Sequence, residues 1–223
     1  MKVPAMQKPR SASGGPVRLG LAVACALLAL PLLAHNTTDA HDGKHAAPEV
    51  KAVVPQGARV TITDTPLVDQ HGRGLLFKSE VLAERLVVIG FVYTSCTTVC
   101  PVTSQIMAQA RSRLAGRAAR DVVFVTVTVD PLRDRPAVLK AHAERIDAGA
   151  DWRWLTGAKP QVDEVLRSFG SWTANYADHP PLIMVGDAKS GRWLRFFGFP
   201  NPEQLVAAVG ELGAARSRHG NHE

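Results

Sequence analysis

The chain has 223 residues, of which 46% are hydrophobic and 21% charged, the composition of a globular protein with room for one substantial core. The formal net charge is +6, but residues 1–34 hold four bases and no acid. Without them 22 bases face 20 acids, a net charge of +2, which gives no electrostatic basis for nucleic-acid binding.

The N-terminal segment looks like a targeting signal. Its four bases, all before residue 19, precede an uncharged apolar run at residues 19–34. This pattern predicts a signal peptide or an N-terminal membrane anchor over residues 1–34, and the run is short beside the roughly 20 residues of a typical membrane span. We therefore expect an exported, periplasmic protein, either soluble or anchored to the inner membrane. Cys25 lies in this segment, so Cys96 and Cys100 form the only cysteine pair of an exported form.

Three further regions follow the signal. Residues 35–57 lack a sustained apolar period and predict a flexible tether, whereas residues 58–214 predict the folded domain. Residues 215–223 resemble the tether and predict a flexible tail. The tether contains three histidines, His35, His41 and His45.

Strand and helix patterns alternate through the folded domain. An alternating stretch and a turn at residues 59–74 come first. Later strands are predicted at residues 85–93, 121–130, 152–155, 182–187 and 192–197. Helices are predicted at residues 101–114, 136–146, 161–169 and 202–212. This order predicts an α/β fold, a thioredoxin-like three-layer sandwich with a central mixed β-sheet.

Cys96 and Cys100 lie between the buried strand at residues 85–93 and the helix expected from Pro101. Proline disfavours helical geometry in the residue before it, so we expect Cys100 at the helix cap and Cys96 in the loop. A purely structural disulfide here would close a small loop worth only about 2 kcal/mol. The helix N-terminus favours thiolate, which both exchanges disulfides and binds metals. The local pattern leaves a redox pair and a metal site open.

A third ligand would favour the metal site, and the domain offers three histidines. His71 lies in a turn and His142 is expected on a helix surface, where a polar residue needs no further reason. His179 ends the loop before the strand at residues 182–187. In a thioredoxin-like arrangement that loop faces the cysteine loop, so His179 is the candidate third ligand.

Several motifs between about residues 63 and 209 resemble the SCO/SenC family of copper proteins. They are PLVDQHGRGLLFKSEV, VVIGFVYTSCTTVCP, FVTVTVDPLRDRPAVLKAHAERI, DWRWLTG and the DH pair at residues 178–179. The resemblance implies that Cys96, Cys100 and His179 are copper ligands. It also implies that Asp130 and Asp134 are acidic residues beside the site.

The resemblance further implies a function. The implied function is that of an exported copper chaperone, without enzymatic activity, that passes one copper ion to a membrane subunit of a respiratory cytochrome oxidase. Thiol reductants or other copper chaperones would be further partners, and only the N-terminal segment would contact the membrane. Two thiolates suit Cu(I), and one imidazole also tolerates Cu(II).

The runner-up function is an enzyme. A thiol-disulfide oxidoreductase would use Cys96 to attack and Cys100 to resolve. A peroxidase, suggested by Thr97 three residues before Cys100, matches little else. The chain also departs from the family where Thr97 replaces a usual proline and where Pro180 and Pro181 follow His179. Thioredoxin-fold oxidoreductases carry a cis-proline near this place, so a cis bond at either proline stays open.

Overall fold

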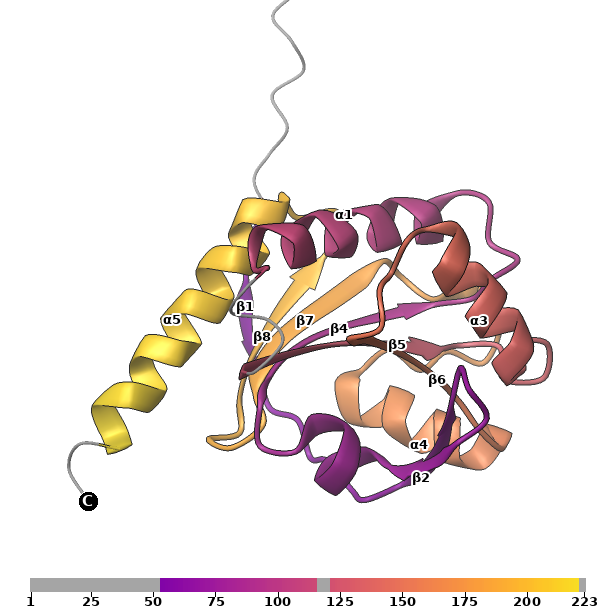
Figure 1. Ribbon diagram of the computed structural model, residues 1–223, viewed down its shortest axis with the longest axis horizontal. Helices are drawn as coiled ribbons and strands as arrows, with labels where there is room; N and C mark the ends of the chain where they lie inside the picture. The colour runs from indigo at the N-terminus through magenta and orange to yellow at the C-terminus, as the bar shows by residue number, and fades with distance from the viewer. Residues whose placement is uncertain (1–52, 116–120, 221–223) are drawn as a thin grey trace, which may run out of the picture. The chain divides into compact units, whose positions relative to one another are not determined.

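A mixed β-sheet forms the middle layer of the molecule (Figure 1). The structure is a computed structural model that describes residues 53–115 and 121–220. Across the sheet of these residues the strands follow in the order β1 (Gln56–Ala58), β8 (Arg192–Phe197), β7 (Leu182–Asp187), β4 (Leu86–Val92), β5 (Val122–Thr128), β6 (Trp152–Thr156), β2 (Pro66–Asp69) and β3 (Gly74–Leu76). The pairs β4–β5 and β5–β6 are parallel, whereas the other neighbours are antiparallel.

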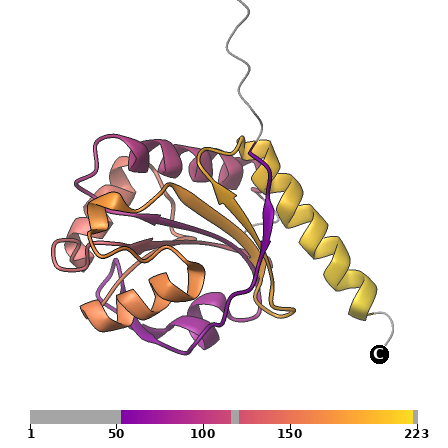
Figure 2. The same ribbon diagram turned by 180° about the vertical axis from the view of Figure 1, so that it is seen from behind.

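Helices cover both faces of this sheet. The first face carries α1 (Val99–Arg113), α3 (Pro136–Arg145) and α5 (Pro202–Gly220). The opposite face carries α4 (Lys159–Phe169) and the π-helical turn η1 (Phe77–Leu82), as the view from behind shows (Figure 2). The predicted thioredoxin-like three-layer α/β sandwich is confirmed.

Alternation along β4 explains its uninterrupted apolar sequence. Val88 packs into the core beneath α1, while Ile89 and Phe91 pack into the core beneath α4. Successive strand residues point to opposite faces, so a strand covered on both sides must be apolar throughout. Gly90 completes the arrangement, because a Cβ there would collide with the Met107 sulfur of α1.

The topology gathers three loops at one edge of the sheet. The parallel strands β4 and β5 end at this edge, and the antiparallel strand β7 begins there. The loop that carries Cys96, the loop at residues 129–135 and the segment that carries His179 therefore meet at the same edge.

Several features of the chain differ from the prediction. α1 begins at Val99 rather than at Pro101. Pro101 is tolerated in the first helical turn because its missing N–H would have no partner inside the helix. β1 lies mostly within the predicted tether and pairs with β8. α5 continues to Gly220, past the predicted domain end at residue 214. Every peptide bond in the described part of the chain is trans, so the cis bond considered at Pro180 or Pro181 is absent.

The predicted signal or anchor at residues 1–34 lies outside the described residues, as does most of the predicted tether. Within residues 53–115 and 121–220, no helix is long and apolar enough to cross a membrane.

A substitution at Gly186 tests how tightly the sheet is packed. The partner of Gly186 across the β7–β8 pair is Trp193, whose buried indole occupies the space that a Cβ at residue 186 would need. We expect Gly186→Ala to lower the free energy of unfolding by about 3 kcal/mol, the upper end of typical overpacking costs. Urea denaturation of the full chain measures this change. Gly57→Ala, which meets nothing within 4 Å, is the control, and an equal loss in both variants would contradict the packing argument.

Candidate functional site

The two cysteines meet at the start of α1. The backbone N–H of Cys100 donates to the Cys96 sulfur at 3.4 Å, and both residues are free thiols. Thr98, the N-cap residue, makes no side-chain capping bond. The Cys96 sulfur therefore acts as the acceptor that a capping side chain normally supplies, and it receives the favourable field of the helix N-terminus.

The two thiols differ sharply in acidity. Burial raises the pKa of Cys96, but hydrogen bonds from Cys100 and Thr98 outweigh it and lower that pKa from 9.0 to about 6. Burial, with the neighbouring Cys96 and Asp134, raises the pKa of Cys100 to about 12. At neutral pH the site thus holds one thiolate and one thiol.

His179 directly follows the short helix η2 (Tyr176–Asp178) and is buried. Its Nε2 lies 3.0 Å from the backbone oxygen of Phe91. A carbonyl only accepts hydrogen bonds, so Nε2 carries the proton. Burial lowers the pKa of His179, which keeps the ring neutral and leaves its lone pair on Nδ1. Within the described residues this Nδ1 is buried and has no hydrogen-bond partner.

This arrangement suits a metal ligand. Metal-binding histidines usually donate one ring N–H to a carbonyl or carboxylate, which fixes the ring and leaves the other nitrogen as donor. The Phe91 carbonyl plays that part for His179. The buried Nδ1 of His179 has no hydrogen-bond partner, which fits a nitrogen that binds a metal ion.

Tyr93 connects the cysteine loop with His179, a role that the sequence analysis missed. Its ring packs edge-on against His179 at 5.8 Å between centroids, and its carbonyl accepts the Cys96 N–H at 3.2 Å. Burial and the neighbouring Cys96 and Cys100 raise the pKa of Tyr93 to about 12. The sequence signal for this role is the position of Tyr93 at the end of a buried strand, three residues before Cys96.

The structure does not gather all three predicted ligands around one point. Cys96 and Cys100 are in direct contact, whereas His179 packs against Tyr93. No three Cys, His, Asp or Glu side chains form a ready metal-binding group in the part of the chain that the structure describes. The Cys-Cys-His set stays a prediction.

The two predicted acidic residues serve the loops around the site. Asp134 is buried and accepts hydrogen bonds from the Thr94 N–H at 3.0 Å and the Thr128 hydroxyl at 2.6 Å. It thereby joins the ends of β4 and β5. Asp130 is also buried and pairs with Arg133 at 2.9 Å. Both residues therefore stabilise the loops around the site.

The other histidines fall outside the site. His71 is exposed in its turn. His142, expected on a helix surface, is instead buried and packs on Trp154 at 5.2 Å between ring centroids. The expectation failed because α3 lies flat on the sheet and turns this position inward. Burial lowers the pKa of His142.

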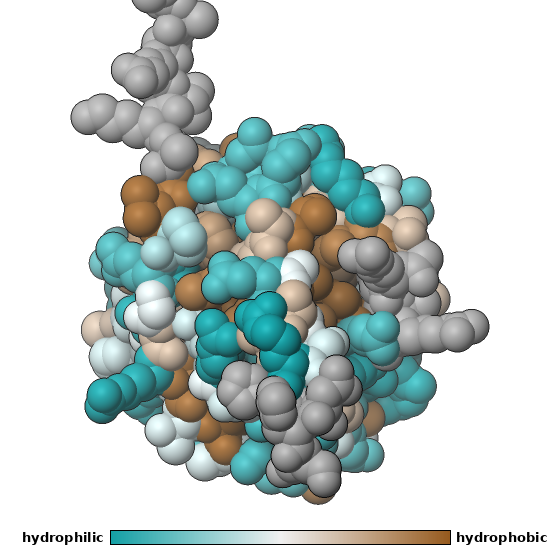
Figure 3. Space-filling model, turned by 90° about the vertical axis from the view of Figure 1, so that its left-hand side faces the viewer, coloured by the Kyte–Doolittle hydropathy of each residue, from teal (hydrophilic) through white to brown (hydrophobic). Residues whose placement is uncertain are grey.

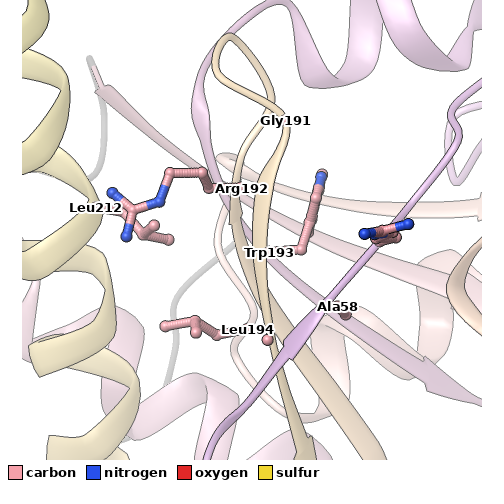
Figure 4. Close-up of a pocket in the computed structure, with 8 residues that line it drawn as sticks. Ala58, Gly191, Arg192, Trp193, Leu194 and Leu212 are labelled. Atoms are coloured by element: carbon pink, nitrogen blue, oxygen red, sulfur yellow. The ribbon is translucent and has the colours of Figure 1, made fainter.

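A pocket lies between β1, the turn after β7, and α5, where Arg192 extends toward Leu212 (Figure 4). Its lining residues are Gly57, Ala58, Arg59, Gly191, Arg192, Trp193, Leu194 and Leu212. They include no thiol, imidazole or carboxylate. On the side of the molecule that carries α5, hydrophilic residues surround smaller hydrophobic areas (Figure 3). The cysteine edge is therefore the better candidate site.

Comparison with known proteins identifies the family of the chain. The family model described as SCO1/SenC matches residues 55–208, most of the chain. The chain belongs to the SCO1/SenC family. The expected membership is confirmed.

Three proteins illustrate what this chain is similar to. An SCO2-like protein of Rickettsia felis is 31% identical over 144 residues, which cover 60% of this chain and 67% of the relative. A putative copper-binding protein of Stutzerimonas stutzeri is 30% identical over 109 residues, 49% of this chain and 52% of the relative. The solved structure of Bradyrhizobium japonicum ScoI with copper bound is 26% identical, with a TM-score of 0.55, covering 72% of this chain and 99% of that one.

Thiol alkylation tests the acidity of the pair. In the reduced, metal-free protein, iodoacetamide should modify Cys96 at a rate that rises through about pH 6 and then levels off, because thiolate is the nucleophile. Cys100 should stay unmodified at pH 7. Peptide mass spectrometry locates the adducts, and Cys96→Ser is the control. Half-maximal reactivity of Cys96 near pH 9 would contradict the described hydrogen bonding.

Proposed function

We propose that this chain is an exported copper chaperone that holds one copper ion with Cys96, Cys100 and His179. We further propose that it delivers the ion to a membrane subunit of a respiratory cytochrome oxidase. The observation that carries the proposal is the buried, partnerless Nδ1 of the neutral His179 ring, at the same sheet edge as the dithiol.

The donor set fits copper. Two soft sulfurs bind Cu(I) well, and one imidazole adds a donor that also suits Cu(II). Three protein ligands leave the coordination shell open, so ligands of an acceptor can enter. Because the pKa of Cys100 is raised, copper binding must release a proton from Cys100.

Relatives support the copper part of the proposal. The Bradyrhizobium protein is described with copper bound and the Stutzerimonas relative as copper-binding. A structural neighbour, BsSco, is described as a member of the Sco family of cytochrome c oxidase assembly proteins, and its 20% identity supports the fold alone. Export and anchoring rest on the pattern of residues 1–34, which lie outside the described residues.

Disulfide exchange is the second candidate, and one observation favours it. The pKa of about 6 for Cys96 and about 12 for Cys100 is the asymmetry of an attacking thiolate beside a resolving thiol. An oxidised partner disulfide would be reduced while Cys96 and Cys100 form their own disulfide. The same pair would serve both candidates, whereas His179 belongs only to copper binding.

Copper titration separates the two candidates. We expect the reduced full chain to bind one Cu(I) per molecule. Cys96→Ser and Cys100→Ser should abolish tight binding, and His179→Ala should weaken it by at least the roughly 10- to 100-fold that loss of a residue supporting a metal ligand usually costs. Anaerobic competition with a Cu(I) chelator measures the affinities.

A matched exchange assay supplies the control. Reduction of a small-molecule disulfide by Cys96 should persist in His179→Ala, because the imidazole is no part of the exchange. His71→Ala should leave copper binding unchanged. Equal copper affinity in wild type and His179→Ala would refute the three-ligand site and leave disulfide exchange as the supported function.

A further inference from the structure

The segment just before His179, residues 173–178, makes few hydrogen bonds to the rest of the fold. Hydrogen bonds of residues 173–178 in the described structure join them to one another: Thr173 to Asn175, and Asn175 to Ala177 and Asp178. His179 fixes the end of the segment through Phe91 and Tyr93, so residues 173–178 need contacts of their own against the sheet edge.

Tyr176 supplies these contacts. Its ring packs edge-on against the Tyr93 ring at 5.1 Å between centroids. On the Tyr176 ring lies the guanidinium of Arg133, 5.3 Å from the centroid. Arg133 is itself held by the buried carboxylate of Asp130 at 2.9 Å. A continuous row of contacts thus runs from the loop after β5 to the residue three positions before His179.

We propose that Arg133 and Tyr176 are positioning residues: their contact, called the latch below, holds the His179 segment against the sheet edge that carries the dithiol. The proposal deepens the copper function described above and rests on it. Arg133 acts on copper only through Tyr176 and His179.

The Arg133–Tyr176 contact lies on the exposed rim of the site, where it contributes little to the stability of the whole fold. The Arg133 side chain is 63% exposed, whereas its Asp130 partner is 3% exposed. A cation over an aromatic ring at an exposed site is a weak contact. A weak contact matters here because Tyr176 joins residues 173–178 to Tyr93 and Arg133, and the segment carries the one imidazole of the proposed site.

Two variants break the latch from opposite sides. Arg133→Ala removes the cation, and Tyr176→Leu removes the ring while leaving the Asp130–Arg133 pair in place. We expect each to weaken Cu(I) binding of the full chain, Arg133→Ala by about twofold to fivefold. Tyr176→Phe keeps the ring and should bind like wild type. Arg135→Ala makes the same change in charge two residues away and is the matched control.

A double-mutant cycle with His179→Ala identifies the route of the effect. In the His179→Ala background, Arg133→Ala and Tyr176→Leu should cause no further loss, because the ligand that they position is gone. An equal loss in both backgrounds, or no loss in the wild-type background, would overturn the latch.

Amide hydrogen exchange in the metal-free protein tests the latch without copper. Residues 173–179 should exchange faster in Arg133→Ala and Tyr176→Leu, and unchanged in Tyr176→Phe and Arg135→Ala. If wild type and His179→Ala bind copper equally, the proposed function fails and the exchange result alone decides the latch. Unchanged exchange in both latch variants would overturn it.

Discussion

The hydrogen bond from the Cys100 N–H to the Cys96 sulfur governs the chemistry of this protein. It forms because the loop at residues 93–98 joins the end of β4 to the start of α1, and because Gly90 lets α1 lie close to the strand. The free N–H groups of a helix start favour an anion, and the sulfur is the acceptor that the loop provides. One cysteine is thereby held as thiolate, and its buried neighbour keeps its proton until a metal or an oxidant removes it.

The sheet topology supplies the second constraint. Two parallel strands end, and an antiparallel strand begins, at the edge where the dithiol sits. His179 therefore reaches this edge on a separate segment, with its ring fixed by the Phe91 carbonyl and packed on Tyr93. In the proposed copper site, a sulfur pair on one element and an imidazole on another would let the coordination change when a partner approaches. Such a site suits a protein that carries copper and then releases it.

Much of the fold could be predicted because its signals are local. The apolar runs of β4 and β5, the prolines at residues 101 and 136 and the alternation of elements lie within short windows of sequence. The site was predicted only in part. Three features depend on residues that are far apart in the chain. They are the burial of His142, the unpartnered Nδ1 of His179 and the contact between Tyr93 and His179. The Arg133–Tyr176 contact joins loops that no periodicity relates.

The central claim is that His179 completes a copper site begun by the two cysteines. X-ray absorption at the copper edge of the reduced, Cu(I)-loaded full chain tests it most directly, because sulfur and nitrogen neighbours scatter differently. The account predicts two sulfur neighbours and one nitrogen neighbour in wild type, with the nitrogen contribution lost in His179→Ala. A copper ion bound by sulfur alone, with the same spectrum in both proteins, would contradict it.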